Sequence, residues 1–487
     1  MVLLHTLLAR PFILILLGFW ATLAFHEHRL IMVGICLVVT FGMLVVQLRK
    51  RFIAIQTFAH LMGACLGLLL VAFEAPSPNL GGVTAIRGWI TSDPKLVRSG
   101  WPTVEVHFIS IESGGKPLSQ QGKVRVLLKG MDLDEVPAVG SAIMVRGSYH
   151  PNSGLFFSEN KKLALLREGP EWQQQRQKLF AIIRKTFSTL RGQAGPLAIA
   201  LLLGQGDELT QEEKQLFREA GASPLLALSG LHLGILAGLL SFLVKNSFHR
   251  VLAQFLVALA LILFVMLVGP LPSLMRALVF WVAIHVTSWL CWEVDPLEVN
   301  SMGAFFLLLV FPDWVFNPSF ILSLSAMIGI LLLSNDYQDY LRLALGKRTS
   351  QLLSVGMAAS AGTGPASLVL FDSFYPQAVL SNLVGILPLV VFLYGELVYL
   401  LLSLFPVLAP LQGLVGLGLE LVAQLLFWLM GIFSVMGRGQ GFMGWGLWFI
   451  TLAPALHLVY RYWRYGYLLQ FPRPDSALFT RTRVGSS

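Results

Sequence analysis

The sequence predicts an α-helical polytopic membrane protein of about 12 spans, several of them broken, with a small OB-like β-barrel inserted on the extracytoplasmic side. Three observations support this fold class. Of the 487 residues, 55% are hydrophobic and only 13% are charged, about half the charged share of a soluble protein. The mean hydropathy is +0.71, and strand-like alternation is concentrated in residues 77–169. The composition excludes a cytosolic enzyme, a secreted domain and a fibrous protein.

Residues 1–76 are expected to form N-terminal transmembrane helices. Each helix needs about 20 apolar residues, and three apolar runs cover 11–25, 30–48 and 52–73. The basic cluster Arg49–Arg51 separates the second run from the third and marks the cytoplasmic side. The N-terminus is therefore expected in the cytoplasm, and the segment after residue 73 outside it. The first run lacks a small-residue cleavage pattern, so it is interpreted as a retained span.

Residues 77–169 are expected to form the extracytoplasmic barrel. Alternating apolar and polar residues predict five short strands, over 83–93, 103–111, 123–129, 142–149 and 155–163. Turn-forming sequences such as Asn152-Ser153-Gly154 separate them. Five short strands fit a closed barrel of the oligonucleotide/oligosaccharide-binding (OB) type, and a short β-sandwich is the alternative.

Residues 170–194 are expected to form an amphipathic helix on the membrane surface, because apolar and basic side chains recur there at helical spacing. Residues 195–470 are expected to form the second transmembrane domain. Nine candidate spans lie in it: 222–243, 251–268, 271–292, 297–312, 317–334, 350–371, 376–403, 407–435 and 442–463. Basic residues then fall on cytoplasmic loops, so the tail, 471–487, is expected in the cytoplasm.

Four interrupted apolar segments carry polar side chains, which are costly in a bilayer and usually functional. The segments are 201–236, 269–277, 317–326 and 381–388. In the first of them Ser229 and His232 are three residues apart, hence on one helical face. The sequence predicts a polar path through the membrane lined by Gln205, Asp207, Ser229, His232, Arg276, Asn317, Ser323 and Asn382.

Several of these residues also have a structural interpretation. Arg276 could instead bind carbonyls that the nearby prolines leave free. Ser229 and His232 could simply permit close helix packing, or they could form an intramembrane serine hydrolase, although no third orienting group accompanies them. Asn382 could be a polar contact between helices.

The four segments, in this order and rough spacing, resemble those of the ComEC competence proteins, which form the inner-membrane channel for DNA uptake in bacterial transformation. The similarity is strongest in 201–236, where the family has a Gly-acidic pair and later a Ser-Gly-Leu-His sequence. Blocks around Arg276, at Phe320–Ser323 and at Asn382–Pro388 follow. The sequence departs from the family at Pro224, where many members have His, and at Ile321, where Gln is usual.

The resemblance implies a channel that translocates single-stranded DNA into the cytoplasm through the bacterial cytoplasmic membrane. It also implies several partners: single-stranded DNA, membrane lipid, an extracytoplasmic DNA receptor, and a cytoplasmic motor or single-strand-binding protein. Many members continue into a metallo-β-lactamase-like domain, whereas this sequence has no HxHxDH motif. A nuclease is therefore expected to be a separate protein. Since no nucleotide-binding loop is found either, the chain is expected to be no enzyme and to use no cofactor or metal.

Passage of a polyanion requires a basic conduit and, outside the membrane, a basic groove with aromatic platforms. The net charge is +9, and the barrel region has eleven basic residues against eight acidic ones. The candidate DNA contacts are Arg87, Lys95, Arg98, Lys123, Arg125, Lys129, Arg146, Trp89 and Trp101. The alternative is a spacer domain with an ordinary solvated face. For the whole protein, the alternatives are a transporter of another anionic polymer or lipid-linked sugar, and the serine hydrolase.

Overall fold

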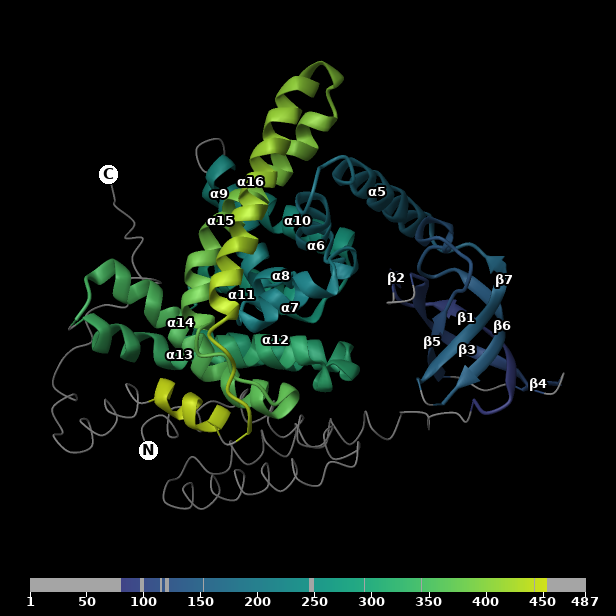
Figure 1. Cartoon of the computed structure of the whole chain (residues 1–487), viewed down its shortest axis with the longest axis horizontal. Coiled ribbons are helices and arrows are strands. Elements are labelled where there is room, and N and C mark those ends of the chain that lie inside the picture. The colour runs from purple at the N-terminus through teal and green to yellow at the C-terminus, as the bar shows by residue number, and fades with distance from the viewer. Residues whose placement is uncertain are drawn as a thin grey trace.

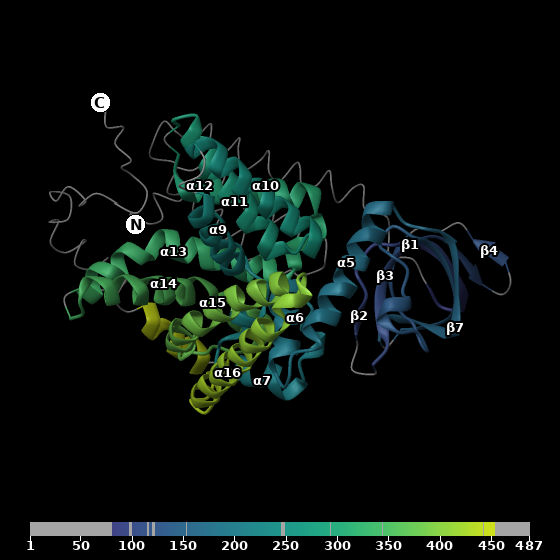
Figure 2. The same cartoon turned by 90° about the horizontal axis from the view of Figure 1, so that it is seen from above.

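A β-barrel lies beside a helical domain in the computed structural model, and helix α5 (Glu171–Phe187) runs between them (Figure 1, Figure 2). The described residues are 80–96, 100–113, 116–118, 122–151, 153–244, 249–292, 294–342, 344–441 and 443–452. The expected spans over 1–76, the tail over 471–487 and the candidate DNA contact Arg98 lie outside these residues.

Seven strands form the barrel: β1 (Val83–Ile90), β2 (Lys95–Leu96), β3 (Pro102–Ser113), β4 (Lys116–Leu118), β5 (Gly122–Leu127), β6 (Ala142–His150) and β7 (Leu155–Arg167). The five long strands pair in the order β1-β6-β7-β5-β3, and pairing of β1 with β3 closes the circle. Strands β5 and β7 are parallel neighbours. The predicted five-stranded barrel is confirmed in the described residues, and its closed circle of strands contradicts the sandwich alternative.

The barrel closes because buried and exposed residues largely alternate along its strands, and because the strands bend at glycines. In β3, Val104, Val106 and Phe108 point inward and are at most 2% exposed. Register shifts occur next to Gly88 and Gly147. A Cβ on these glycines would lie 2.2 Å from the carbonyl oxygen of His107 and 1.9 Å from that of Phe157. The neighbouring strand therefore requires glycine, and the bulges supply the curvature that closure needs.

Helix α5 has one buried and one exposed apolar face. Phe180, Ile183 and Phe187 are buried in a cluster with the next helix, α6 (Ala194–Leu203). Trp172 and Ile182 are 52% and 60% exposed. The helix is thus part of the core of the helical domain as well as a surface element.

The helical domain continues through short and long helices, with 3-10 turns between several of them. After α6 these are η2 (Gly206–Glu208), α7 (Gln211–Glu219), α8 (Ser223–Leu226), α9 (Gly230–Val244), α10 (Arg250–Val268), α11 (Pro272–Trp289), α12 (Pro296–Val310), η3 (Pro312–Phe316), α13 (Pro318–Arg342), α14 (Lys347–Phe371), α15 (Ala378–Ser403), η4 (Pro406–Leu408) and α16 (Ala409–Ser434). Helix α11 contacts α9, α12 and α13, and the candidate site lies among these four.

Within the described residues, five helices are long and apolar enough to span a membrane: Val251–Val268, Pro318–Arg342, Lys347–Phe371, Ala378–Ser403 and Pro406–Ser434. Other apolar helices, such as Gly230–Val244, have 10–17 residues. A membrane protein is supported, but the expected 12 spans are not confirmed. The expected span 222–243 is not one continuous helix, because the backbone is extended at Ala227 and separates α8 from α9. Mean hydropathy does not register such a break.

Helices α13 and α14 form a hairpin that depends on small residues. They lie side by side in both views (Figure 1, Figure 2). A Cβ on Gly329 would lie 2.3 Å from the carbonyl oxygen of Ala358 and 2.9 Å from the Cα atom of Gly362. The two backbones therefore touch, as is common where membrane helices associate.

Candidate functional site

Arg276 joins three helices of the membrane domain. It lies in the first turns of α11 and is 8% exposed. Its Nη1 donates to Oδ1 of Asn300 in α12 at 3.0 Å. Its Nε and Nη2 donate to Oγ of Ser323 in α13 at 3.0 and 2.5 Å. Within the described ranges these partners are all neutral, so the buried positive charge has no counter-charge beside it.

An interruption between helices α10 and α11 places Arg276 near the start of α11. Gly269 has a φ of +107°, and Pro272 begins α11, so Arg276 comes one turn after the helix start. Proline at a helix start is favourable, since it lacks only an N–H that has no partner there anyway. Arg276 thus lies near the N-terminal end of α11 rather than in the middle of that helix.

Asn300 is part of this group but is absent from the candidates that the sequence provides. It is 1% exposed, and its Nδ2 has no hydrogen-bond partner among the described residues. The signal that could have revealed it is an amide inside the expected span 297–312, because polar groups there are rare and usually functional. Arg276, Asn300 and Ser323 therefore form one polar cluster, of which the sequence predicted two members.

Ser229 and His232 do contact each other, at the start of α9. Nδ1 of His232 lies 3.3 Å from Oγ of Ser229 and 3.4 Å from its backbone N. His232 is 4% exposed, and its Nε2 has no partner in the described part of the chain. A serine hydrolase needs an acid that orients the second ring nitrogen. The described residues place none there, so the geometry gives this alternative no support.

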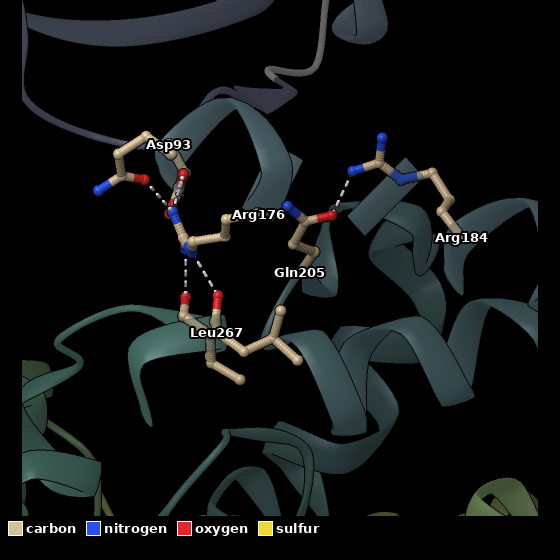
Figure 3. A network of polar contacts seen from close by, with 7 residues as sticks. Asp93, Arg176, Arg184, Gln205 and Leu267 are labelled. Carbon is tan, nitrogen blue, oxygen red and sulfur yellow. Dashed lines mark hydrogen bonds and ion pairs between the residues drawn. The ribbon is translucent and has the colours of Figure 1, made fainter. Parts of the chain in front are cut away.

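Gln205 and Asp207 lie apart from the Arg276 cluster, at the boundary between barrel and helical domain. Arg184 of α5 donates from Nη2 to Oε1 of Gln205 (Figure 3). Its Nε is 3.7 Å from Oε1 of Glu208. Asp207 is exposed and lines a small cavity. The other lining residues are Pro94, Leu96, Leu133, Arg184, Gln205 and Glu208. The cavity therefore has walls from both the barrel and the helical domain.

Asn317 and Asn382 both hydrogen-bond to backbone groups of the helical domain. Oδ1 of Asn317 accepts from the backbone N of Ser319 at 2.9 Å and so caps α13. Nδ2 of Asn382 donates to the carbonyl oxygens of Ala378 at 2.6 Å and Gly221 at 3.3 Å. The second bond links α15 to the turn after α7. Lining of a path by either residue stays a prediction.

On the barrel, strand register assembles a row of side chains. Trp89 of β1 lies opposite His107 of β3, which lies opposite Lys123 of β5. Trp89 is 42% exposed, and Arg125 is exposed two residues beyond Lys123 on the same strand. Lys123 forms an ion pair with Asp313 of η3, so the row ends at the helical domain. His107 is a further member that sequence reasoning missed, because only the pairing places it there.

The remaining barrel candidates are spread more widely. Arg87, Lys95, Trp101 and Arg146 are exposed on β1, on β2, just before β3 and on β6. Lys129 lies over the Phe157 ring, with Nζ 5.2 Å from the centroid, on a cavity that His150 also lines. In the described ranges no three His, Cys, Asp or Glu side chains gather as a metal site would require.

The chain is similar to a known protein family and to two curated proteins. The family model described as Competence protein matches residues 201–465. ComE operon protein 3 of Bacillus subtilis (strain 168) is 32% identical over 203 residues, 42% of this chain and 26% of that protein. An uncharacterized protein of Aquifex aeolicus (strain VF5) is 31% identical over 220 residues, 43% of this chain and 49% of that protein. The chain thus spans no more than about half the length of either relative, and no solved structure matches it significantly. Because the family match takes in more than half of the chain, including the Arg276 cluster, the chain belongs to the competence protein family.

Proposed function

We propose that this protein conducts single-stranded DNA through the bacterial cytoplasmic membrane during natural transformation. The observation that carries the proposal is the buried Arg276 guanidinium, which has only neutral partners in the described part of the helical domain. Each nucleotide brings one phosphate charge, which cannot cross hydrocarbon without compensation. A buried positive charge whose partners in the described residues are all neutral can attract such a phosphate.

The barrel row and the Arg276 cluster suggest a route between them. The row runs over Trp89, His107 and Lys123 to Asp313 in η3. Helix α13 starts at Pro318 directly after η3, and Ser323 lies about 7–8 Å along its axis. A single strand leaving the barrel at Lys123 would therefore need to move only a few nucleotides to reach the hydroxyl that Arg276 binds.

The arrangement in the membrane is part of the same proposal. Both termini lie in the cytoplasm and the barrel outside it, as the distribution of basic residues suggests. An extracytoplasmic receptor delivers DNA to the barrel, and a cytoplasmic motor or single-strand-binding protein draws it inward.

Arg276 variants test the proposal in transforming cells that carry no other copy of the gene. Arg276→Met removes the charge at similar length, Arg276→Lys keeps it, and Arg438→Met, at an exposed position, is the control. We expect DNA uptake to fall at least tenfold in Arg276→Met, to fall less in Arg276→Lys and to remain normal in the control. Equal uptake by Arg276→Met and the native chain, at equal membrane abundance, would show that DNA does not pass this arginine.

A further inference from the structure

Arg176 of α5 connects the barrel to the helical domain through one side chain (Figure 3). The side chain is 9% exposed. Nη1 and Nη2 donate to the two carboxylate oxygens of Asp93 at 2.8 and 2.6 Å, and Nη1 also donates to Oε1 of Gln173 at 3.2 Å. Asp93 lies between β1 and β2 of the barrel. A fork-like pair of this kind fixes both distance and orientation.

The same guanidinium binds the last carbonyl groups of α10. Nε donates to the carbonyl oxygen of Leu267, and Nη2 donates to that of Val268 at 2.9 Å. Carbonyl groups at a helix end lack intrahelical donors, and residues 270 and 272 are prolines without an N–H. Every N–H direction of the guanidinium is thus used. The contacts of Arg176 with Asp93, Gln173, Leu267 and Val268 are called the Arg176 junction below.

Gly269 leaves room for the Arg176 junction. Its φ of +107° is strained for residues with a side chain, and a Cβ there would lie 3.2 Å from Nη2 of Arg176 and 3.5 Å from Oδ2 of Asp93. The interruption at Gly269 therefore has two effects. It allows α11 to start just before Arg276, and it leaves space for the contact between Arg176 and Asp93 of the barrel.

We propose that the Arg176 junction holds the barrel in the orientation from which DNA enters the helical domain, so that Arg176 is a positioning residue for DNA transfer. The inference rests on the proposed function. Asp93 is only four residues from Trp89 and two from Lys95, so its position determines where the DNA-binding face of the barrel lies. On the other side of the junction, Arg276 follows Val268 by eight residues, through a segment stiffened by two prolines.

Other contacts cross this boundary in the described residues. Nε2 of Gln177 in α5 donates to the carbonyl oxygen of Val136 in the barrel at 2.6 Å, but a single bond fixes orientation less well than the paired bonds of Arg176. The pair of Lys123 with Asp313 joins side chains that are 52% and 60% exposed, and exposed ion pairs contribute little. Arg184 binds Gln205 and lies close to Glu208, both in the turn after α6. Loss of Arg176 should therefore leave α5 in place, because Phe180, Ile183 and Phe187 remain buried, while the barrel loses its fixed orientation.

The test uses the full chain with its three cysteines, Cys36, Cys65 and Cys291, replaced by serine. Leu133 of the barrel and Glu208 of the helical domain line the same small cavity. Leu133→Cys and Glu208→Cys, joined by a short bifunctional thiol reagent, then report the position of the barrel. Arg176→Gln is introduced into this background, and Lys178→Gln, an exposed cation on the same helix, is the matched control.

In Arg176→Gln we expect DNA uptake to fall at least tenfold and the crosslinking yield at least threefold. Membrane abundance and the oligonucleotide affinity of the purified full-length protein should stay within twofold of the native values. Crosslinking before DNA is added should restore uptake, because the crosslink then fixes the orientation of the barrel in place of the Arg176 junction. The control should behave like the native chain.

Three results would overturn the inference: normal uptake despite a reduced yield, reduced uptake at a normal yield, or no recovery after crosslinking. If Arg176→Gln is lost from the membrane, Asp93→Asn replaces it, because this change weakens the barrel side and leaves Arg176 on the carbonyls of α10. Asp93→Asn should give the same pattern, and normal uptake at a reduced yield would again refute the inference. Normal uptake in Arg276→Met would instead refute the proposed function itself.

Discussion

Replacing Arg276 with methionine should reduce transport far more than stability, and the structure gives the magnitudes. The change leaves Oδ1 of Asn300 and Oγ of Ser323 without the donors they now have. The acceptor of Asn300 is buried, and an unsatisfied buried acceptor costs ~1–3 kcal/mol; that of Ser323 is half-buried and costs less. Against this, the change removes a buried guanidinium that has only neutral partners in the described ranges, and such a charge carries an effective desolvation penalty of several kcal/mol.

These two contributions have similar size and opposite sign. We expect a net change in unfolding free energy of no more than ~2 kcal/mol, which corresponds to a shift in Tm of no more than ~8 °C for a domain of this size. Loss of a charge-assisted hydrogen bond to a passing phosphate removes ~1.5–3 kcal/mol, or a factor of roughly 10–150 in rate. The variant should therefore fold and fail to transport.

Thermal unfolding of the detergent-purified protein and DNA uptake in cells measure the two quantities. A fall in Tm of more than about 15 °C together with loss of the protein from the membrane would show that Arg276 mainly holds α11, α12 and α13 together. Uptake within twofold of the native level would show that no phosphate meets the guanidinium. Either result would refute the reasoning.

Three further predictions concern the helix hairpin and the barrel. Gly329→Ala should lower Tm through an overpacking cost of ~1–3 kcal/mol, because the new Cβ would meet the backbone of α14. Gly418→Ala, which has open space around it, is the control and should leave Tm unchanged. Equal Tm values for the two variants would contradict the close packing of α13 on α14. Trp89→Ala should weaken oligonucleotide binding by ~1–3 kcal/mol if a base stacks on the indole. Fluorescence anisotropy measures this affinity, and Trp172→Ala, at an exposed position on α5, serves as the control. Arg125→Gln should reduce the slope of log affinity against log salt by about 0.7, the value for one single-strand phosphate contact; an unchanged slope would exclude that contact.

The barrel shows how much of a local fold the sequence can predict. The expected strand over 103–111 corresponds to β3 (Pro102–Ser113), because the two-residue alternation of apolar side chains is a local property. Closure by pairing of β1 with β3, and the parallel pairing of β5 with β7, are non-local. For this reason His107 became a candidate only when the register placed it between Trp89 and Lys123.

The helical domain shows the limit of hydropathy. Apolar length predicted a span over 222–243, yet the extended backbone at Ala227 divides it, since the conformation of one residue has almost no weight in an average over about 20. The polar residues were found individually by their cost in a bilayer. The contact of Asn382 with the turn after α7 fits the alternative of a polar contact between helices, whereas the capping of α13 by Asn317 was not predicted.

By itself the sequence determined that the chain is a membrane protein with a β-barrel, and that Arg276 and Ser323 are unusual where they lie. Only the tertiary structure decided that Arg276 binds both Ser323 and Asn300, and that Arg176 binds Asp93 and the end of α10. The physical reason is distance along the chain. Apolar periodicity acts between residues a few positions apart, whereas the partners of these arginines are 24, 47, 83 and 91 residues away. Such contacts form only when helices and barrel pack together, and a guanidinium then binds whichever acceptors the packing brings within reach.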